Sequence, residues 1–318
     1  MSSTTDLPGG AFRVADLTFS RIGFGAMQLP GPGVFGPPKD HDTAIAVLRT
    51  AVELGVRHID TADFYGPHVS NELIREALSP YPDDLVIVTK VGSSRDEKAN
   101  WIPRREPGQL QEQVHDNLRT LGVEVLDVVN VRMGGQDAPR PGSIARQVEA
   151  VAELQQQGLV RHVGVSTVDA QQIAEARTIT PIVTVQNSYN LANRGDDDLI
   201  GRLADDGIAY VPYFPLGGFT PLQSAVLDRV AERLGASPML VAQAWLLQRS
   251  PNVLLIPGTS SLEHLRENLR AAELALPADA IAELDTIAGE RTIRISAWWF
   301  SSGPNTCRAP SGTKPCLA

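Results

Sequence analysis

Short apolar stretches alternate with amphipathic stretches along most of this chain of 318 residues. The apolar stretches have the length of buried strands, and the amphipathic ones have the 3.6-residue period of helices that cover a sheet. Strands are expected near residues 21–27, 56–60, 85–90, 125–131, 161–165, 182–186, 208–213 and 253–256. Helices are expected near residues 42–54, 70–78, 109–121, 144–157, 169–177, 196–206, 222–248 and 261–272. Eight strand–helix units in series predict an α/β fold of the (β/α)8 TIM barrel type, in which a parallel sheet closes on itself.

The positions of glycine and proline add detail to the predicted helices and help to distinguish two kinds of sheet. The stretch 222–248 is expected to form two helices, because Gly235 and Pro238 interrupt it. An open, doubly wound sheet is the alternative for alternating units, and it normally has a G-x-G-x-x-G turn after an early strand. The nearest candidate, residues 23–28, lacks the third glycine. The sequence therefore favours the closed barrel.

Two segments and the end of the chain lie outside the repeat. Residues 11–20 resemble a short hairpin, and residues 91–107 form a long polar loop of the length typical of lids and binding loops. We expect one barrel domain over residues 1–290, followed by a flexible tail over residues 291–318 that is rich in Ser, Gly, Pro and Thr. The cluster Trp298-Trp299-Phe300 either docks over the mouth of the barrel or packs without function, and we favour the second.

Charge and composition limit the partners. The net charge is −9 and Lys and Arg form no block, so nucleic acid is not expected, because binding it needs a basic face. No apolar run reaches the roughly 20 residues that cross a bilayer, and the first residues lack a signal-peptide pattern. Cys307 and Cys316 both lie in the tail, and the histidines lack metal-ligand spacing. We expect a cytoplasmic enzyme without a metal, and the sequence leaves its oligomeric state open.

One carboxylate, one phenol and one ammonium group are expected at the ends of two neighbouring strands. Asp60 ends the strand at 56–60, Tyr65 follows in the next loop, and Lys90 ends the strand at 85–90. A nearby cation lowers the pKa of a tyrosine, which is ordinarily about 10, and a carboxylate can hold that cation in place. The three residues predict either a tuned proton donor or a structural Asp60–Lys90 ion pair beside an ordinary aromatic residue. From these residues alone both interpretations stay open.

Other strands of the expected barrel also end in polar or special residues. Because the carboxyl ends of all strands meet at one rim, and barrel active sites lie there, a functional site is predicted at this rim. The strand ends in question are Arg132, Ser166-Thr167, Gln186-Asn187, Tyr213 and Thr259-Ser260.

Several motifs resemble a known family. HIDTADFYG, followed by VIVTK, is similar to the aldo-keto reductase signature, and the similarity runs from about Arg21 to about Ala288. The segments LDVVN, AYVPYFPLGGFTPL and LLIPGTSSLEHLREN resemble a bacterial branch associated with pyridoxal reduction. The resemblance implies NADP(H)-dependent hydride transfer to an aldehyde or ketone, with pyridoxal to pyridoxine as a candidate reaction. The catalytic residues that it implies are Asp60, Tyr65, Lys90 and Arg132.

The same resemblance implies a set of NADP(H)-binding residues. It assigns the nicotinamide end to Ser166, Thr167, Gln186 and Tyr213, the pyrophosphate to Leu216 and Gly217, and the adenosine end to Thr259, Ser260, His264, Glu267 and Asn268, with Gly25, Ala26 and Met27 also at the cofactor. The family usually has asparagine at Thr167, and relatives often have arginine at His264 and lysine at Gly258. The chain is therefore expected to bind a 2′-phosphate with a weaker electrostatic clamp.

Arg132 departs from the family pattern, because the family normally has histidine there. It either recognises an anionic oxygen beside the reacting carbonyl or pairs with a carboxylate, and strand alternation puts it with Asn130 inside the barrel. Two other functions remain possible from the sequence: a non-catalytic NADP(H)-binding regulator, and a Schiff-base aldolase with Lys90 as nucleophile. The presence of Tyr65 favours the reductase.

Overall fold

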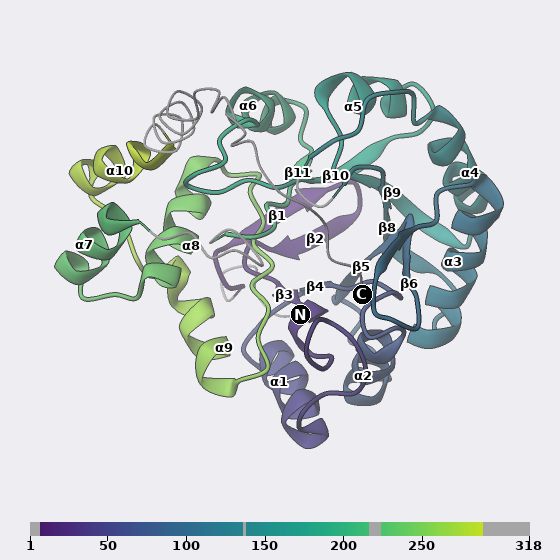
Figure 1. Cartoon of the computed structure of the whole chain (residues 1–318), viewed down its shortest axis with the longest axis horizontal. Helices are drawn as coiled ribbons and strands as arrows, with labels where there is room; N and C mark the ends of the chain where they lie inside the picture. Colours follow the sequence, from purple (N-terminus) through teal and green to yellow (C-terminus); the bar gives the residue numbers. More distant parts are fainter. Residues whose placement is uncertain (1–6, 136–137, 216–223, 289–318) are drawn as a thin grey trace, which may run out of the picture.

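The computed structural model describes residues 7–135, 138–215 and 224–288. Its centre is a parallel sheet with helices around it (Figure 1). The strand order is β11-β10-β9-β8-β5-β4-β3. The strands are β3 (Phe24–Gly25), β4 (His58–Asp60), β5 (Val86–Val91), β8 (Leu126–Arg132), β9 (Val160–Ser166), β10 (Ile182–Gln186) and β11 (Ala209–Tyr210). Each lies within or next to a predicted strand.

The segment 253–255 closes this sheet into a barrel. Tyr210 of β11 forms a parallel bridge with Val253, and Ile22, just before β3, forms one with Leu255. The backbone N–H of Gly23 donates to the carbonyl of Leu255 at 2.7 Å. Because this segment joins both edge strands, it occupies the eighth strand position, and the predicted (β/α)8 barrel is confirmed.

The helices follow the strands in the predicted order. The break predicted in the stretch 222–248 is confirmed: Gly235 ends one helix with φ 61°, Ser237 caps the next, and Pro238 is its first residue. None of the helices in the described ranges is long and apolar enough to cross a membrane. The helices are α1 (His41–Glu53), α2 (Val69–Leu78), α3 (Pro107–Leu121), α4 (Ala145–Gln156), α5 (Ala170–Arg177), α6 (Asp197–Asp205), α7 (Ala225–Leu234), α8 (Pro238–Arg249), α9 (Leu262–Leu269) and α10 (Ala278–Asp285).

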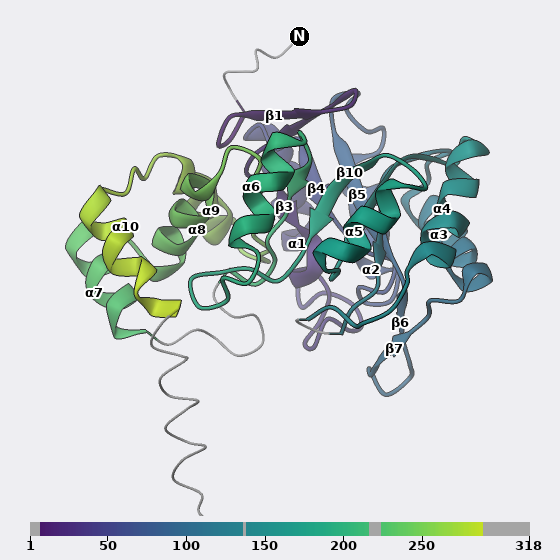
Figure 2. The ribbon, with the colours of Figure 1, turned by 90° about the horizontal axis from the view of Figure 1, so that it is seen from above.

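Two antiparallel hairpins lie at opposite ends of the barrel (Figure 2). The first, β1 (Ala11–Val14) with β2 (Leu17–Ser20), is the hairpin predicted at residues 11–20. The second, β6 (Ser93–Arg95) with β7 (Trp101–Pro103), lies within the stretch predicted as a polar loop. The second hairpin has one exposed strand with little apolar pattern, which is why the sequence did not indicate it.

The interior of the barrel is apolar toward the first hairpin and polar toward the second. On β5, alternation puts Val86, Val88 and Lys90 on the same face, and Lys90 is the last of them toward the carboxyl end. The apolar interior cluster packs Leu17 and Phe19 of the first hairpin against Val86, Val88, Val128, Val183, Ala209, Val211 and Leu254. These apolar side chains fill the end of the barrel covered by the first hairpin, and the polar residues lie at the other end, where the strands have their carboxyl ends.

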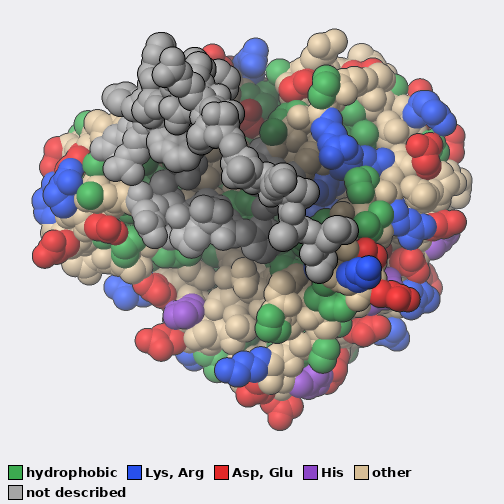
Figure 3. Space-filling view, in the orientation of Figure 1, with side chains coloured by type: hydrophobic (Ala, Val, Ile, Leu, Met, Phe, Trp, Pro, Cys, Tyr) green, Lys and Arg blue, Asp and Glu red, His purple; other side chains and the backbone are tan. Residues whose placement is uncertain are grey.

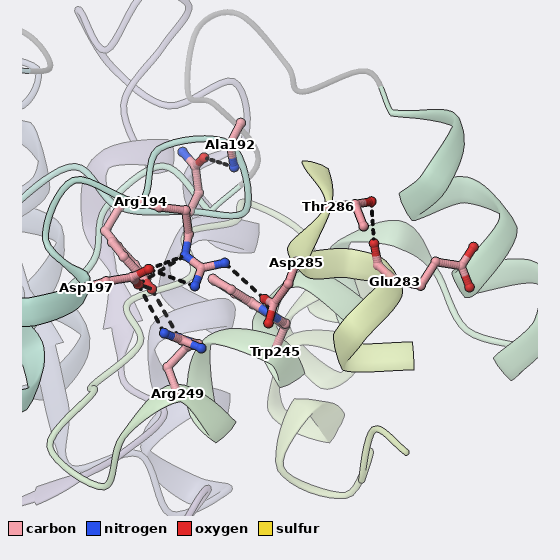
Figure 4. Close-up of polar contacts among 10 residues, drawn as sticks. Ala192, Arg194, Asp197, Trp245, Arg249, Glu283, Asp285 and Thr286 are labelled. Carbon is pink, nitrogen blue, oxygen red and sulfur yellow. Dashed lines mark hydrogen bonds and ion pairs between the residues drawn. The ribbon is translucent and has the colours of Figure 1, made fainter. Parts of the chain in front are cut away.

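Helix α10, which the sequence did not predict, is held by a polar cluster (Figure 4). The carboxylate of Asp285 accepts from Trp245 Nε1 at 3.0 Å and from Arg194 Nη1 at 2.9 Å. Asp197 in turn accepts from Arg194 Nε at 3.0 Å and from Arg249 Nη2 at 3.1 Å. The cluster ties α10 to α8 and to the start of α6.

Candidate active site

A cavity of about 400 Å³ opens at the carboxyl ends of the strands. It is lined by the four predicted catalytic residues and by several of the predicted cofactor-binding residues. The predicted site residues that line it are Gly25, Met27, Asp60, Tyr65, Lys90, Arg132, Gln186, Tyr213 and Asn268. These residues are far apart in the sequence, from Gly25 to Asn268, and the closed sheet brings them together.

Asp60 and Lys90 form a buried ion pair on neighbouring strands. The two residues are 2% and 4% exposed. Lys90 Nζ donates to Asp60 Oδ1 at 2.5 Å and to the carbonyl of Thr61 at 3.0 Å. Gln186 Nε2 donates to the other carboxylate oxygen of Asp60 at 2.8 Å. Both oxygens of the carboxylate are therefore used to hold site residues, and the pair can persist in a buried position because it is hydrogen-bonded as well as charged.

Tyr65 lies beside this pair, and Lys90 Nζ is 5.1 Å from the centre of its ring. Lys90 acts to lower the pKa of Tyr65, as expected, but burial outweighs this effect. Burial raises the pKa of Tyr65 above its usual value, and the nearby Lys90 ammonium only partly opposes the effect. The hydroxyl therefore stays protonated near neutral pH, as a proton donor must.

The ionisation of Lys90 separates two of the possible chemistries. Burial works to lower its pKa, but Asp60 and Tyr65 outweigh burial and raise the pKa of Lys90 above its usual value. A lysine that forms a Schiff base must reach the neutral amine, usually through a depressed pKa. The raised pKa opposes a role for Lys90 as the nucleophile of an aldolase.

Arg132 ends β8 and lines the cavity, and Asn130 on the same face is buried, as alternation predicted. Its Nη1 donates to Thr167 Oγ1 at 3.0 Å, and its Nη2 donates to the carbonyl of Gly135 at 2.7 Å. Thr167 Oγ1 also lies 3.1 Å from the hydroxyl of Tyr213. Thr167 thus joins Arg132 to Tyr213, and it does so in a left-handed backbone conformation with φ 56°.

Two buried amide oxygens in the described part of the cavity wall have no hydrogen-bond partner. They are Oε1 of Gln186 and Oε1 of Gln243, and Gln243 Nε2 donates to Asn268 Oδ1 at 2.8 Å. A buried acceptor without a partner costs about 1–3 kcal/mol, so its partner is expected in a ligand or in water. Gln186 lies beside Lys90's partner Asp60, and Gln243 lies beside α9. The carboxamide N–H of a nicotinamide could donate to Gln186 Oε1, and the amino N–H of an adenine could donate to Gln243 Oε1. These residues therefore fit a nicotinamide cofactor.

Comparisons with known proteins agree with this geometry. Residues 21–288 match the Aldo/keto reductase family. The chain belongs to the aldo/keto reductase family. It is 60% identical over 292 residues to the pyridoxine 4-dehydrogenase of Escherichia coli (strain K12), covering 91% of this chain and 100% of that protein.

Solved structures of the family have the same fold. A thermostable aldo-keto reductase in complex with the inhibitor epalrestat superposes with a TM-score of 0.72 at 28% identity, covering 87% of this chain and 99% of that one. An aldo/keto reductase from Klebsiella pneumoniae, in complex with NADP and acetate, superposes with a TM-score of 0.69 at 25% identity, covering 85% and 92% of the two chains. As a member of this family, the chain is an oxidoreductase that acts on carbonyl or hydroxyl groups.

Other residues predicted for this aldo/keto reductase do not line the cavity, and their roles stay predictions. Ser166 and Thr259 are buried, and the backbone N–H of His264 in α9 is capped by Ser261 Oγ at 3.4 Å. Leu216 and Gly217 lie outside the described residues, as do Trp298, Trp299 and Phe300. The predicted residues away from the wall are Ala26, Ser166, Thr167, Thr259, Ser260, His264 and Glu267.

The sequence missed several residues of the cavity wall. Trp101 and Arg105 lie in the stretch 91–107, whose length had indicated a binding loop, so their general position could have been found. Met239 and Gln243 on α8 carried no motif that would have found them. The missed wall residues include Phe64, Trp101, Arg105, Arg140, Met239 and Gln243.

Proposed function

We propose that this aldo/keto reductase uses NADPH to reduce an aldehyde, with pyridoxal to pyridoxine as the first reaction to test. The observation that carries the proposal is the buried Asp60–Lys90 pair beside a protonated Tyr65 on the wall of one cavity. The 60% identity to the E. coli pyridoxine 4-dehydrogenase supports the choice of substrate. NADP in the Klebsiella pneumoniae structure supports the choice of cofactor.

Tyr65 acts as the general acid in this proposal. The bound cofactor supplies the hydride for the carbonyl carbon. As negative charge develops on the carbonyl oxygen, the Tyr65 hydroxyl donates its proton to that oxygen. Lys90 stabilises the phenolate that remains, because it is a cation held 5.1 Å from the centre of the ring. In the reverse direction, the phenolate takes the proton of the alcohol.

Asp60 and Gln186 position this acid relative to the cofactor. Asp60 keeps Lys90 charged and fixed, with 2.5 Å between Oδ1 and Nζ. Gln186 is fixed by its own bond to Asp60, so that its unpartnered oxygen can accept from the nicotinamide carboxamide. One carboxylate thus orients both the proton donor and the group that binds the hydride carrier.

In this proposal the adenosine end of the cofactor binds near Gln243 and Asn268 and at the start of α9. The positive end of the helix dipole at its first turn favours an anion, and His264 lies there, with its own N–H capped by Ser261. One or two charge-assisted hydrogen bonds to a 2′-phosphate contribute roughly 1.5–3 kcal/mol each. We therefore propose a preference for NADPH over NADH.

The test measures cofactor binding and turnover separately. Fluorescence titration should give a lower dissociation constant for NADPH than for NADH, and NADPH should be oxidised in the presence of pyridoxal. Equal dissociation constants would remove the cofactor preference. Tight NADPH binding without turnover of pyridoxal or any other aldehyde would favour a non-catalytic regulatory protein. This second function is tested because Arg132 stands where the family normally has histidine.

A further inference from the structure

Two arginines that the proposed reaction does not use line the same cavity as Tyr65. Arg105 lies between β7 and α3, and Arg140 lies between β8 and α4. Both belong to loops at the carboxyl ends of the strands, on the side of the barrel where Arg132 also reaches the wall. On this face, Lys and Arg side chains gather beside the central hollow (Figure 3).

Consecutive backbone carbonyls orient two of these guanidinium groups side by side. Arg105 Nη2 donates to the carbonyl of Gly134 at 2.5 Å, and Arg132 Nη2 donates to that of Gly135 at 2.7 Å. Position 134 has to be glycine, because a Cβ there would lie 2.2 Å from the Thr167 side chain. The Arg140 main chain is fixed by Gln172, whose Nε2 donates to its carbonyl at 2.8 Å.

The positive charges at this wall act on one another. Burial lowers the pKa of Arg105, and the nearby charges of Arg140 and Arg132 lower it further. Within the described ranges, Arg105 and Arg140 form no ion pair, whereas Arg104, next in sequence, pairs with Glu112. Nε of Arg105 is buried and lacks a hydrogen-bond partner among those residues. Arg105 therefore has an unused donor at a wall where like charges repel.

A bound anion would give Arg105 Nε a hydrogen-bond partner and would compensate the positive charges at this wall. A guanidinium group donates two parallel hydrogen bonds to a carboxylate or a phosphate, and such pairs are stronger than neutral hydrogen bonds. The negative charge of the anion would also offset the repulsion between Arg105 and Arg140. A neutral substituent would leave the buried Nε without a partner and the charges uncompensated.

We propose that Arg105 and Arg140 bind an anionic group, a phosphate or a carboxylate, which the carbonyl substrate carries away from its reacting carbon. This inference rests on the proposed reductase function, since it concerns the substrate of the same cavity. It differs from the role of Arg132, which ends β8 and donates to Thr167. The substrate class is thus an aldehyde or ketone with a second, negatively charged end.

Matched substrate pairs test the proposal. Pyridoxal 5′-phosphate against pyridoxal probes a phosphate, and succinic semialdehyde against butanal probes a carboxylate. For at least one pair, kcat/KM of the parent should be about 10- to 150-fold higher for the anionic member, the range of one charge-assisted hydrogen bond. Arg105→Met and Arg140→Met should each reduce that ratio about tenfold or more, while Arg104→Met, which removes a paired charge outside the cavity, should keep it. The pair that shows the effect identifies the anion.

Failure of the inference can be told apart from failure of the reductase function. If the parent turns over the members with and without the added phosphate or carboxylate alike, or if Arg105→Met and Arg140→Met lower both members equally, the anion site is wrong and the reductase stands. If no aldehyde is turned over, calorimetric titration with inorganic phosphate decides. Binding that is lost in Arg105→Met and Arg140→Met but kept in Arg104→Met supports the site. Equal or absent binding in all proteins overturns it.

Discussion

The Nζ of Lys90 lies 2.5 Å from Asp60 Oδ1 and 5.1 Å from the centre of the Tyr65 ring. One ammonium group thus connects a buried carboxylate with a buried phenol. Burial raises the pKa of Tyr65, so the proton stays on the phenol at neutral pH, and Lys90 is positioned to stabilise the phenolate once the proton has left. A purely structural ion pair would not require the tyrosine at the wall of the cavity.

Tyr65→Phe should lower kcat for pyridoxal by roughly 10²–10⁴-fold, the usual contribution of general acid catalysis. The ring remains, so the dissociation constant for NADPH should change little. Steady-state kinetics and fluorescence titration measure the two quantities. Tyr81→Phe is the matched control, because it removes a hydroxyl that donates to the carbonyl of Leu121 at 2.6 Å, away from the cavity. Turnover that survives in Tyr65→Phe would assign the acid to another group.

Arg132→Met should affect pyridoxal more than a plain aromatic aldehyde. Pyridoxal has a ring hydroxyl beside its aldehyde that ionises readily, and a guanidinium group binds such an oxygen well but cannot donate its proton. The loss of one charge-assisted hydrogen bond predicts a loss of kcat/KM about 10- to 150-fold larger for pyridoxal. The comparison is made with an aromatic aldehyde that lacks the neighbouring hydroxyl. Equal losses would mean that Arg132 supports the site as a whole, through Thr167 and Gly135.

Asp63→Asn should stabilise the protein, and more so at higher pH. Burial raises the pKa of Asp63 to about 8, and one of its oxygens has no partner among the described residues. Between about pH 4, where the unfolded carboxyl ionises, and pH 8, the folded state binds the extra proton, so this residue makes stability fall as pH rises.

The gain in the free energy of unfolding of Asp63→Asn over the parent should therefore grow by about 1.4 kcal/mol per pH unit in this window and level off above it. Urea unfolding at several pH values measures it. Asp83→Asn, at an exposed carboxylate, is the control substitution. A difference that is independent of pH would mean that Asp63 ionises alike in both states.

Asp285→Ala should destabilise the protein by about 1–3 kcal/mol, because it leaves Trp245 Nε1 and one amino group of Arg194 without their acceptor. Chemical denaturation measures the change. The control is Glu283→Ala in the same helix, which breaks pairs with Arg229 and Arg233 that contribute little because solvent screens them. If both substitutions have the same small effect, the cluster in Figure 4 does not hold α10 in place.

Local pattern accounts for most of the fold that the sequence predicted. The period of each apolar stretch distinguished strands from helices, and Gly235 and Pro238 marked the break between α7 and α8 through backbone conformation alone. The sequence also predicted that Asp60, Lys90, Arg132 and Gln186 would meet, because parallel strands present their carboxyl ends at one rim. These inferences need only the chain's own local chemistry and the closure of a barrel.

The hairpin β6–β7 and the helix α10 were not predicted from the sequence. The hairpin has an exposed strand without a buried face, and the helix is fixed by Asp285 through side chains of two distant segments. The hairpin has no periodic pattern that stands out from its surroundings. In and just after α10, the buried Ala280, Leu284 and Ile287 do follow the spacing of a helix, so the sequence contained a signal for this element.

The sequence by itself determined the fold, the family resemblance and the residue types at the catalytic rim. Only the tertiary structure decided that Tyr65 has a raised pKa, that Gln243 faces Asn268, and that Arg105 and Arg140 share the cavity with it. Desolvation depends on every segment that packs around a group, and the distance between two charges depends on loops that are far apart in the chain. Neither quantity is encoded in the spacing of residues along the sequence.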